Sequence, residues 1–261
     1  MKQKLISILI TNYNKGNFLR KTISSCENQS YLKKEIIIFD DSSTDESINI
    51  LNKICNKNIH VFFNKKKRYK SSPLNQLYGI KKIFDLSKGE IIFLLDGDDF
   101  FLKDKLKLIV KKFEHNKEIE FIQDTPYFGK QKRKIKLKKK NHSVSIWPSF
   151  YPTSCIAIKR KFFSDFLKNA EFGKFPNLEI DARLSIFAFL KRKFYIYNKT
   201  LTIYNYDSFG ITSNYKKFST NWWKKRDEAF EYMKILMKKI KLNFIPSFDF
   251  CVTKFIYFFI K

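Results

Sequence analysis

The sequence of 261 residues is poor in glycine, proline and histidine. Only 7 Gly and 6 Pro argue against collagen-like and Gly/Pro-rich linker proteins, and 44% apolar residues argue against a disordered chain. The three histidines, His60, His115 and His142, are scattered, so a histidine-based metal centre is not expected. A chain of this length can bury a sizeable core, which predicts one large domain or two small ones.

Cysteines and long apolar runs are also few. Cys26, Cys55, Cys155 and Cys251 form no Cys-x-x-Cys pair, so they predict neither a zinc site nor a disulfide framework and favour a reducing cytosol. The apolar run 5–10 is too short for a signal peptide, and no window approaches the roughly 20 apolar residues of a bilayer span. We therefore expect a cytoplasmic protein, with a peripheral position on the inner face of the cell membrane as the alternative.

Negative charge is scarce relative to positive charge: 52 Lys and Arg against 25 Asp and Glu give a net charge of +27. One interpretation is a polyanionic partner, either nucleic acid or an anionic membrane face. The other is the Lys, Asn and Ile bias that an AT-rich genome produces. Contacts to bases favour arginine, which is rare here, so we expect no nucleic-acid partner.

The first hundred residues alternate between apolar runs and segments of helical spacing. Runs at 5–10, 35–39, 60–63 and 90–95 predict buried strands, with helices over 18–26, around 48–55 and over 74–86. This order predicts a doubly wound, mostly parallel sheet with right-handed crossovers.

Three of these four strands end in polar clusters: residues 11–14, Asp40-Asp41-Ser42-Ser43 and Asp96-Gly97-Asp98-Asp99. Ligands of such sheets bind beyond the carboxyl ends of the strands, so the clusters should gather on one rim. Carboxylates close together repel one another, and a bound cation is the simplest remedy. Two Asp separated by one small residue suit Mg²⁺ or Mn²⁺ together with substrate phosphates, and Gly97 would leave room for a diphosphate.

The pattern changes after residue 99. Helices are expected over 102–113, 162–167, 179–191 and 220–240, and short strands over 156–158, 194–197 and 201–206. The basic segment 130–140 is interpreted as a solvated hairpin.

Segments 6–14, 36–45 and 88–99, in this order and spacing, resemble the inverting GT-A-fold glycosyltransferases of family 2, as does Asn28-Gln29 before the second strand. The resemblance is strong over 5–113 and looser to about 215. It implies an α/β, Rossmann-like, doubly wound and mostly parallel sheet, a smaller mixed acceptor-side sheet and a C-terminal helical tail. The implied division is a glycosyltransferase domain at 1–215 (nucleotide-sugar half 1–100, acceptor half 101–215) and a basic aromatic tail at 216–261.

The resemblance also implies roles on the donor side. Thr11 and Tyr13 would cradle the nucleotide base, Tyr13 by stacking, and Asp41 would accept a hydrogen bond from the base ring. Asp96 would face the ribose, and Asp98 would bind the metal ion, Mn²⁺ or Mg²⁺.

In this family a basic residue after the third strand often meets the diphosphate. Arg68 and Lys70 are the candidates, and the basic run 65–70 does not decide between them. The sequence departs from the family where Asn75-Gln76 stands in place of the usual Arg-Asn.

The catalytic base of the family lies late in the chain, at the start of a helix. The segment Glu179-Ile180-Asp181 resembles it, which implies that Asp181 is the base and Glu179 the alternative. Arg183 would orient Asp181 or bind the acceptor. Trp147 and the segment 153–155 fall where related enzymes line the acceptor pocket, and 207–215 is a candidate closing loop.

The expected function is therefore inverting transfer of a sugar from a nucleotide-diphosphate sugar, by default a UDP-sugar, to a glycan or lipid-linked acceptor in cell-surface polysaccharide synthesis. The aromatic and basic start of the tail, at Trp222-Trp223, suits either an anionic membrane or docking on the domain. One alternative, a haloacid-dehalogenase-type phosphatase, expects Thr or Val where Phe100 stands. The other, a basic nucleic-acid-binding protein, conflicts with the acidic rim.

Overall fold

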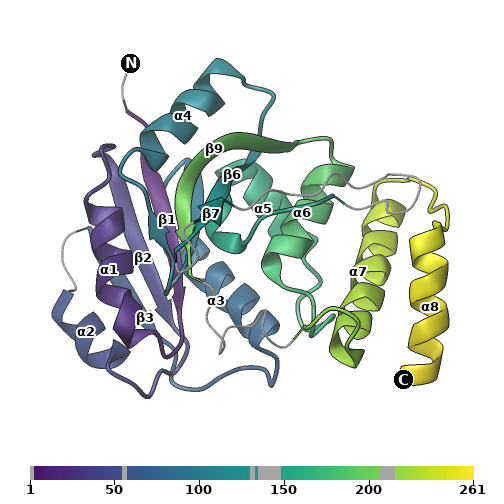
Figure 1. The fold of residues 1–261 in the computed structure, drawn as a ribbon. Helices are drawn as coiled ribbons and strands as arrows, with labels where there is room; N and C mark the ends of the chain where they lie inside the picture. Colours follow the sequence, from purple (N-terminus) through teal and green to yellow (C-terminus); the bar gives the residue numbers. More distant parts are fainter. Residues whose placement is uncertain (1–2, 55–57, 130–132, 135–147, 206–214) are drawn as a thin grey trace.

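Nine strands form one continuous sheet in the computed structural model, which describes residues 3–54, 58–129, 133–134, 148–205 and 215–261 (Figure 1). The strand order is β3-β2-β1-β4-β8-β6-β9-β5, and β7 pairs with β6. Helices cover both faces of this sheet.

The predicted alternation of strands and helices is confirmed in the first hundred residues. The strands are β1 (Ile6–Asn12), β2 (Lys34–Asp40), β3 (Ile59–Phe63) and β4 (Ile91–Asp96), all parallel to one another. Between them lie α1 (Gly16–Glu27), α2 (Ser47–Ile54) and α3 (Ser72–Leu86). Parallel pairing places the carboxyl ends of these strands on one rim, as expected.

Side chains of the central strands are buried on both faces because each face meets a different set of helices. Ile8 and Ile10 of β1 pack in the cluster that includes buried residues of α1, α2 and α4. Leu9, between them, packs in the cluster that includes α3, α5, α6 and α7. This two-residue period explains why the strands are continuous apolar runs in the sequence.

The second half adds the strands β5 (Phe100–Phe101), β6 (Phe121–Phe128), β7 (Arg133–Lys134), β8 (Ile156–Lys159) and β9 (Phe194–Tyr204). β8 is antiparallel to both β4 and β6, so the expected acceptor-side sheet is the mixed half of the same sheet. Residues 194–204 form one strand where two were expected, because its pairing with β6 continues through register shifts on either side of Thr125.

Helices of the second half are α4 (Lys105–His115), α5 (Arg160–Lys168), α6 (Ile180–Leu190), α7 (Thr220–Lys239) and α8 (Phe248–Ile260), with the 3₁₀ helix η1 (Thr153–Cys155) before β8. The helical tail is confirmed: α7 buries Phe230 and Met233 in the core beside α6, and α8 lies along α7 at the end of the molecule (Figure 1). Among the described residues, no helix combines the length and the apolar character needed to span a bilayer.

Candidate functional site

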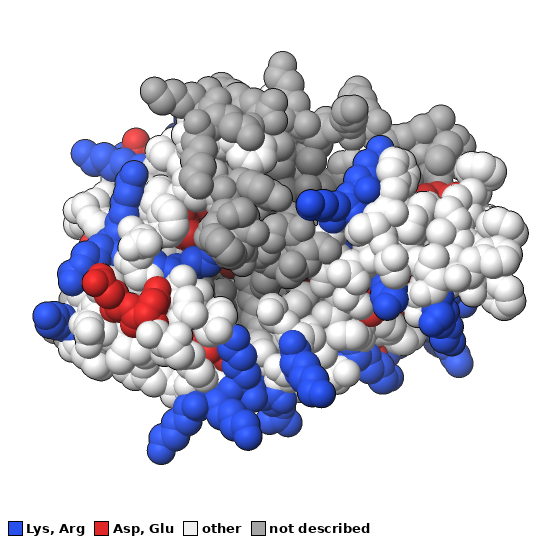
Figure 2. Space-filling model, turned by 60° about the horizontal axis from the view of Figure 1, so that its bottom comes forward, with Lys and Arg blue, Asp and Glu red and all other residues white. Residues whose placement is uncertain are grey.

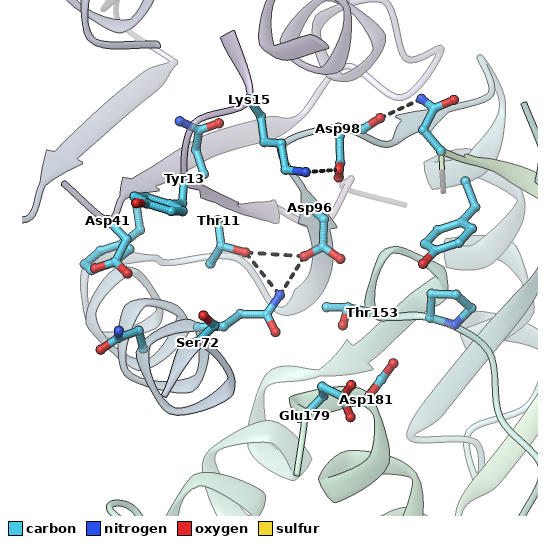
Figure 3. Close-up of a pocket in the computed structure, with 18 of the residues that line it drawn as sticks. Thr11, Tyr13, Lys15, Asp41, Ser72, Asp96, Asp98, Thr153, Glu179 and Asp181 are labelled. Carbon is cyan, nitrogen blue, oxygen red and sulfur yellow. Dashed lines mark hydrogen bonds and ion pairs between the residues drawn. The ribbon is translucent and has the colours of Figure 1, made fainter. Parts of the chain in front are cut away.

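A cavity opens at the carboxyl ends of β1, β2 and β4, and six of the residues singled out in the sequence line it (Figure 3). They come from the ends of three strands and from the start of α6: Thr11, Tyr13, Asp41, Asp96, Asp98 and Asp181. The fold therefore brings the acids of both halves of the chain to one place.

The two acids at the end of β2 have different surroundings. Asp40 is buried and accepts hydrogen bonds from Asn12 Nδ2 (2.7 Å) and from the Ser43 backbone N–H (2.9 Å), so it fixes the turn after the strand. Asp41 lines the cavity and accepts a hydrogen bond from Asn64 Nδ2 at 2.8 Å. Burial raises the pKa of Asp41, whereas Asn64 and the charge of Lys67 lower it. Asp41 is thus the one positioned to meet a ligand.

Tyr13 lies beside Asp41 and presents an aromatic ring that is 43% exposed. The ammonium group of Lys67 lies 3.2 Å from the ring centre, a cation–π contact. Lys67 also lines the cavity. An aromatic face next to an acceptor carboxylate and a cation suits a heteroaromatic base joined to phosphates.

Asp96 ends β4 at the centre of the cavity (Figure 3). Its Oδ1 accepts hydrogen bonds from Gln76 Nε2 at 2.7 Å and from Thr11 Oγ1 at 3.4 Å. Burial raises the pKa of Asp96 to about 7, and the negative charges of Asp98 and Asp181 contribute. Burial first, and then the neighbouring charges, therefore favour a proton on Asp96 or a cation beside it.

Asp98 is 9% exposed, and its Oδ2 lies 2.7 Å from the ammonium nitrogen of Lys15. Gly97 lines the cavity. A larger residue at this position would clash with Asn12, because its Cβ would lie 2.6 Å from Asn12 Oδ1. The glycine thus lets β1 and the acidic loop approach each other, in addition to leaving room for a ligand.

Asp99 belongs to the framework of the loop. It is fully buried and accepts hydrogen bonds from Ser154 Oγ (2.5 Å) and from the backbone N–H of Asn205 (2.8 Å). Asn205 also donates from Nδ2 to the backbone oxygen of Asp98 at 2.6 Å. Burial, with the charges of Asp98 and Asp96, raises the pKa of Asp99. These contacts hold the acidic loop against η1 and the end of β9.

A hard divalent cation fits the chemistry of this donor set. Carboxylate oxygens of Asp96 and Asp98 are the ligand type that Mg²⁺ and Mn²⁺ prefer. A cation would also offset the negative charges of Asp98 and Asp181, which add to the effect of burial on the pKa of Asp96. Within the described ranges no group of three or more His, Cys, Asp or Glu could hold a metal ion.

Asp181 is in the first turn of α6, across the cavity from Asp96 (Figure 3). Burial and the neighbouring charge of Glu179 raise the pKa of Asp181 to about 7, while the charge of Lys225 lowers it. Glu179 is 6% exposed and forms an ion pair with Lys225 of α7. A carboxyl group with such a pKa is suited to taking a proton near neutral pH.

Three basic residues singled out in the sequence do not line the cavity: Arg68, Lys70 and Arg183. Arg68 does not line the cavity; it is exposed, its Nε donates to Tyr69 Oη at 3.2 Å, and its guanidinium lies over the Tyr78 ring. Lys70 does not line the cavity either, whereas Lys67 does. Arg183 is fully buried and points away from the site.

The guanidinium of Arg183 donates to four backbone carbonyls before α6, those of Ala170, Lys174, Phe175 and Leu178. It therefore neither contacts Asp181 nor is open to an acceptor. Its role is to fix the loop from which α6 starts.

On the proposed acceptor side, Thr153 and Pro152 line the cavity, while Ser154 supports the acidic loop and Cys155 is buried. Trp147 and residues 207–214 lie outside the described residues. Sequence reasoning missed Lys15, Lys67, Gln76 and Asn205. The sequence carried a signal for two of these residues: Lys67 lies in the basic run 65–70, and Gln76 belongs to the Asn75-Gln76 pair.

Comparison with known proteins is consistent with this geometry. The family described as Glycosyl transferase family 2 matches residues 7–168. An uncharacterized glycosyltransferase of Haemophilus influenzae is 40% identical over 111 residues, which are 41% of each chain. Hyaluronan synthase of Pasteurella multocida is 24% identical over 88% of this chain but only 27% of its own length. The chain thus spans less than half of these relatives.

Solved structures show the same fold at low sequence identity. TarS of S. aureus in complex with UDP-GlcNAc is 16% identical, with a TM-score of 0.65 over 97% of this chain and 70% of that one. The mannosyltransferase PcManGT of Pyrobaculum calidifontis, in complex with GDP-Man and Mn²⁺, is 13% identical, with a TM-score of 0.63 over 98% of this chain and 70% of that one. The sheet order, the acidic strand ends and the match over residues 7–168 lead to one assignment: the chain belongs to glycosyl transferase family 2.

Proposed function

We propose that this protein transfers a sugar from a nucleotide-diphosphate sugar to an acceptor hydroxyl, with inversion at the anomeric carbon. The observation that carries the proposal is the meeting of Asp41, Asp98 and Asp181 in one cavity, although they come from β2, from the loop after β4 and from α6. Family membership supports a transferase of this class.

The donor would lie along the strand ends. Tyr13 would stack on the base, Asp41 would accept a hydrogen bond from its ring N–H, and Asp96 with Thr11 would meet the ribose. Lys67, which lines the cavity, would meet a phosphate in place of Arg68 or Lys70, the two candidates from the sequence. We propose a UDP-sugar as donor, because TarS was solved with UDP-GlcNAc; the GDP-Man complex of PcManGT makes a guanosine sugar the alternative.

The chemistry is a single displacement. The Asp181 carboxylate takes the proton of the acceptor hydroxyl, whose oxygen forms a bond to the anomeric carbon as the bond to the diphosphate oxygen breaks. A divalent cation, Mn²⁺ or Mg²⁺, held by Asp98 with Asp96 nearby, would offset the charge of the departing diphosphate. The raised pKa of Asp181 makes it a stronger base than an exposed carboxylate.

We propose a glycan or a lipid-linked sugar as acceptor and surface polysaccharide assembly as the setting, in line with the hyaluronan synthase likeness. In this proposal the donor half comprises residues 1–100, the acceptor half 101–215, and the tail 216–261. The alternative of nucleic-acid binding is disfavoured, because a cavity lined by Asp41, Asp96, Asp98, Glu179 and Asp181 repels a polyanion.

A nucleotide-sugar panel tests the donor site. Thermal shift with UDP-, GDP- and dTDP-sugars, each with and without Mn²⁺, should show one base preferred and a larger shift with the ion. Asp98→Ala should remove the Mn²⁺-dependent part of that shift, while Asp85→Ala, at an exposed position on α3, serves as the matched control. A panel without any metal-dependent shift would contradict the proposed site.

A further inference from the structure

The charged residues of the C-terminal helix α8 face the protein rather than the solvent. Its two charged residues, Asp249 and Lys254, both face α7. Asp249 pairs with Arg226, and Lys254 Nζ lies 2.5 Å from Asp227 Oδ1 and 2.6 Å from Glu231 Oε1. The charged side chains of α8 therefore form ion pairs that attach the helix to α7.

The outward side of α8 is apolar. Phe248, Phe255, Phe258 and Phe259 are 68–79% exposed, and Cys251 is exposed as well. At 100° per residue these five positions fall within an arc of about 100° on one side of the helix. An ordinary surface helix presents charged and polar groups to water on that side. In α8 the exposed side is apolar and the charged side faces the protein. Such an exposed apolar surface indicates a binding surface for an apolar partner.

The apolar surface extends beyond the helix. Ile245, in the segment that leads into α8, is 75% exposed, and Leu242 is 48% exposed. Lys241 and Lys261, which precede and follow these apolar residues in the sequence, are exposed. Figure 2 shows basic side chains around much of this face of the molecule, while its right-hand end, where Figure 1 places α8, is mostly uncharged.

We propose that α8 lies flat in the headgroup region of an anionic lipid bilayer, with its phenylalanines in the acyl boundary. A net charge of +27 attracts an anionic surface, and exposed lysines beside an aromatic face are the composition of interfacial helices. The same charge opposes a second copy of the chain as the occupant of this face. The 13 described residues of α8 make a helix about 20 Å long, enough to lay its row of phenylalanines along a surface.

A chain of ion pairs links α8 to the candidate site. Arg226 on α7 holds Asp249 of α8, and the adjacent Lys225 pairs with Glu179, which neighbours Asp181. The inference rests on α8 alone and not on the proposed reaction, so the two can fail separately.

Flotation of the full chain with vesicles tests the proposal. Wild type should float with phosphatidylcholine vesicles that contain phosphatidylglycerol and bind pure phosphatidylcholine at least about tenfold more weakly, since binding needs both charge and apolar contact. Phe255→Ser/Phe258→Ser/Phe259→Ser should lose binding by at least about tenfold at unchanged melting temperature. A single Phe258→Glu, at a side chain 79% exposed, should do the same without touching α7.

Leu32→Ser is the matched control, because Leu32 is 78% exposed outside the α8 surface and its loss should leave flotation unchanged. Light scattering of the same samples in solution should give a monomer. The proposal is overturned if wild type ignores anionic vesicles, or if the phenylalanine variants bind as wild type does. It is also overturned if wild type is a dimer that Phe258→Glu splits, which would make a second copy the occupant.

Discussion

Asp181 at the start of α6 and Asp96 at the end of β4 face the same cavity, and the charge of Asp181 contributes to the raised pKa of Asp96. Asp96 comes from the first hundred residues and Asp181 from the second half of the chain. The contact between their charges fits the proposed displacement, in which the group that removes the proton must lie near the groups that hold the donor.

The raised pKa of Asp181 predicts a specific acid limb in the pH profile. Below about pH 7 the carboxyl group carries a proton and cannot take another from the acceptor, so kcat/KM should fall as the pH falls through that value. An exposed aspartate would give a limb near pH 4. Transfer rates measured between pH 5 and 9, in buffers of constant ionic strength, check this, and a flat profile down to pH 5 would contradict Asp181 as the base.

Two neighbours of Asp181 should move that limb in opposite directions. Glu179→Gln removes a negative charge that raises the pKa of Asp181, so the limb should move to lower pH. Lys225→Met removes a positive charge that lowers the pKa, so the limb should move to higher pH. The paired variants also separate the two candidate bases, because transfer would be lost in Glu179→Gln if Glu179 were the base.

Lys67 and Arg68 give a matched pair for the phosphate contact. Lys67→Met should weaken donor binding by about tenfold, since it removes a cation from the cavity wall. Arg68→Met should change it little, because Arg68 is exposed and bonded to Tyr69. Calorimetric titration with the preferred nucleotide sugar measures both; equal losses would show that Arg68 turns into the site when the donor binds.

The buried pair of Lys105 and Asp124 should stabilise the frame behind the acidic loop. Both side chains are fully buried, the Nζ–Oδ1 distance is 2.7 Å, and Lys105 Nζ also donates to the backbone oxygen of Ser154 at 2.6 Å. Lys105→Met strands a buried carboxylate and should lower the free energy of unfolding by about 3 kcal/mol. Urea unfolding measures this.

The exposed pair of Lys81 and Asp85 is the control for that variant. Lys81→Met should change the free energy of unfolding by no more than about 0.5 kcal/mol, because exposed ion pairs contribute little. Adding Asp124→Leu to Lys105→Met should recover part of the loss, since it removes the stranded charge. Similar effects for the buried and the exposed variant would refute this assignment.

The parts of the fold that the sequence predicted well depend on short-range patterns. The first four strands contain apolar runs, β2 and β4 are followed by acids, and parallel pairing alone places Asp41 and Asp98 on one rim. Two strands are expected over 194–197 and 201–206, yet β9 is one strand that pairs with β6 through register shifts. That pairing is not encoded locally.

The parts that the sequence could not predict depend on side-chain direction. The run 65–70 is basic at almost every position and has no apolar period, so nothing in it shows that Lys67 points inward and Arg68 outward. Arg183 lies two residues after Asp181, but in the fold it turns to carbonyls of the preceding loop. Lys15 meets Asp98 only because β1 and β4 are neighbours in the sheet.

The most direct test of the account is sugar transfer by Asp181→Asn, measured with the donor found in the panel and compared with donor affinity in the same samples. The account predicts unchanged donor binding and a loss of transfer of at least about a hundredfold, because the amide cannot accept the acceptor proton. Transfer within a few-fold of wild type would contradict it and remove Asp181 from the role of base.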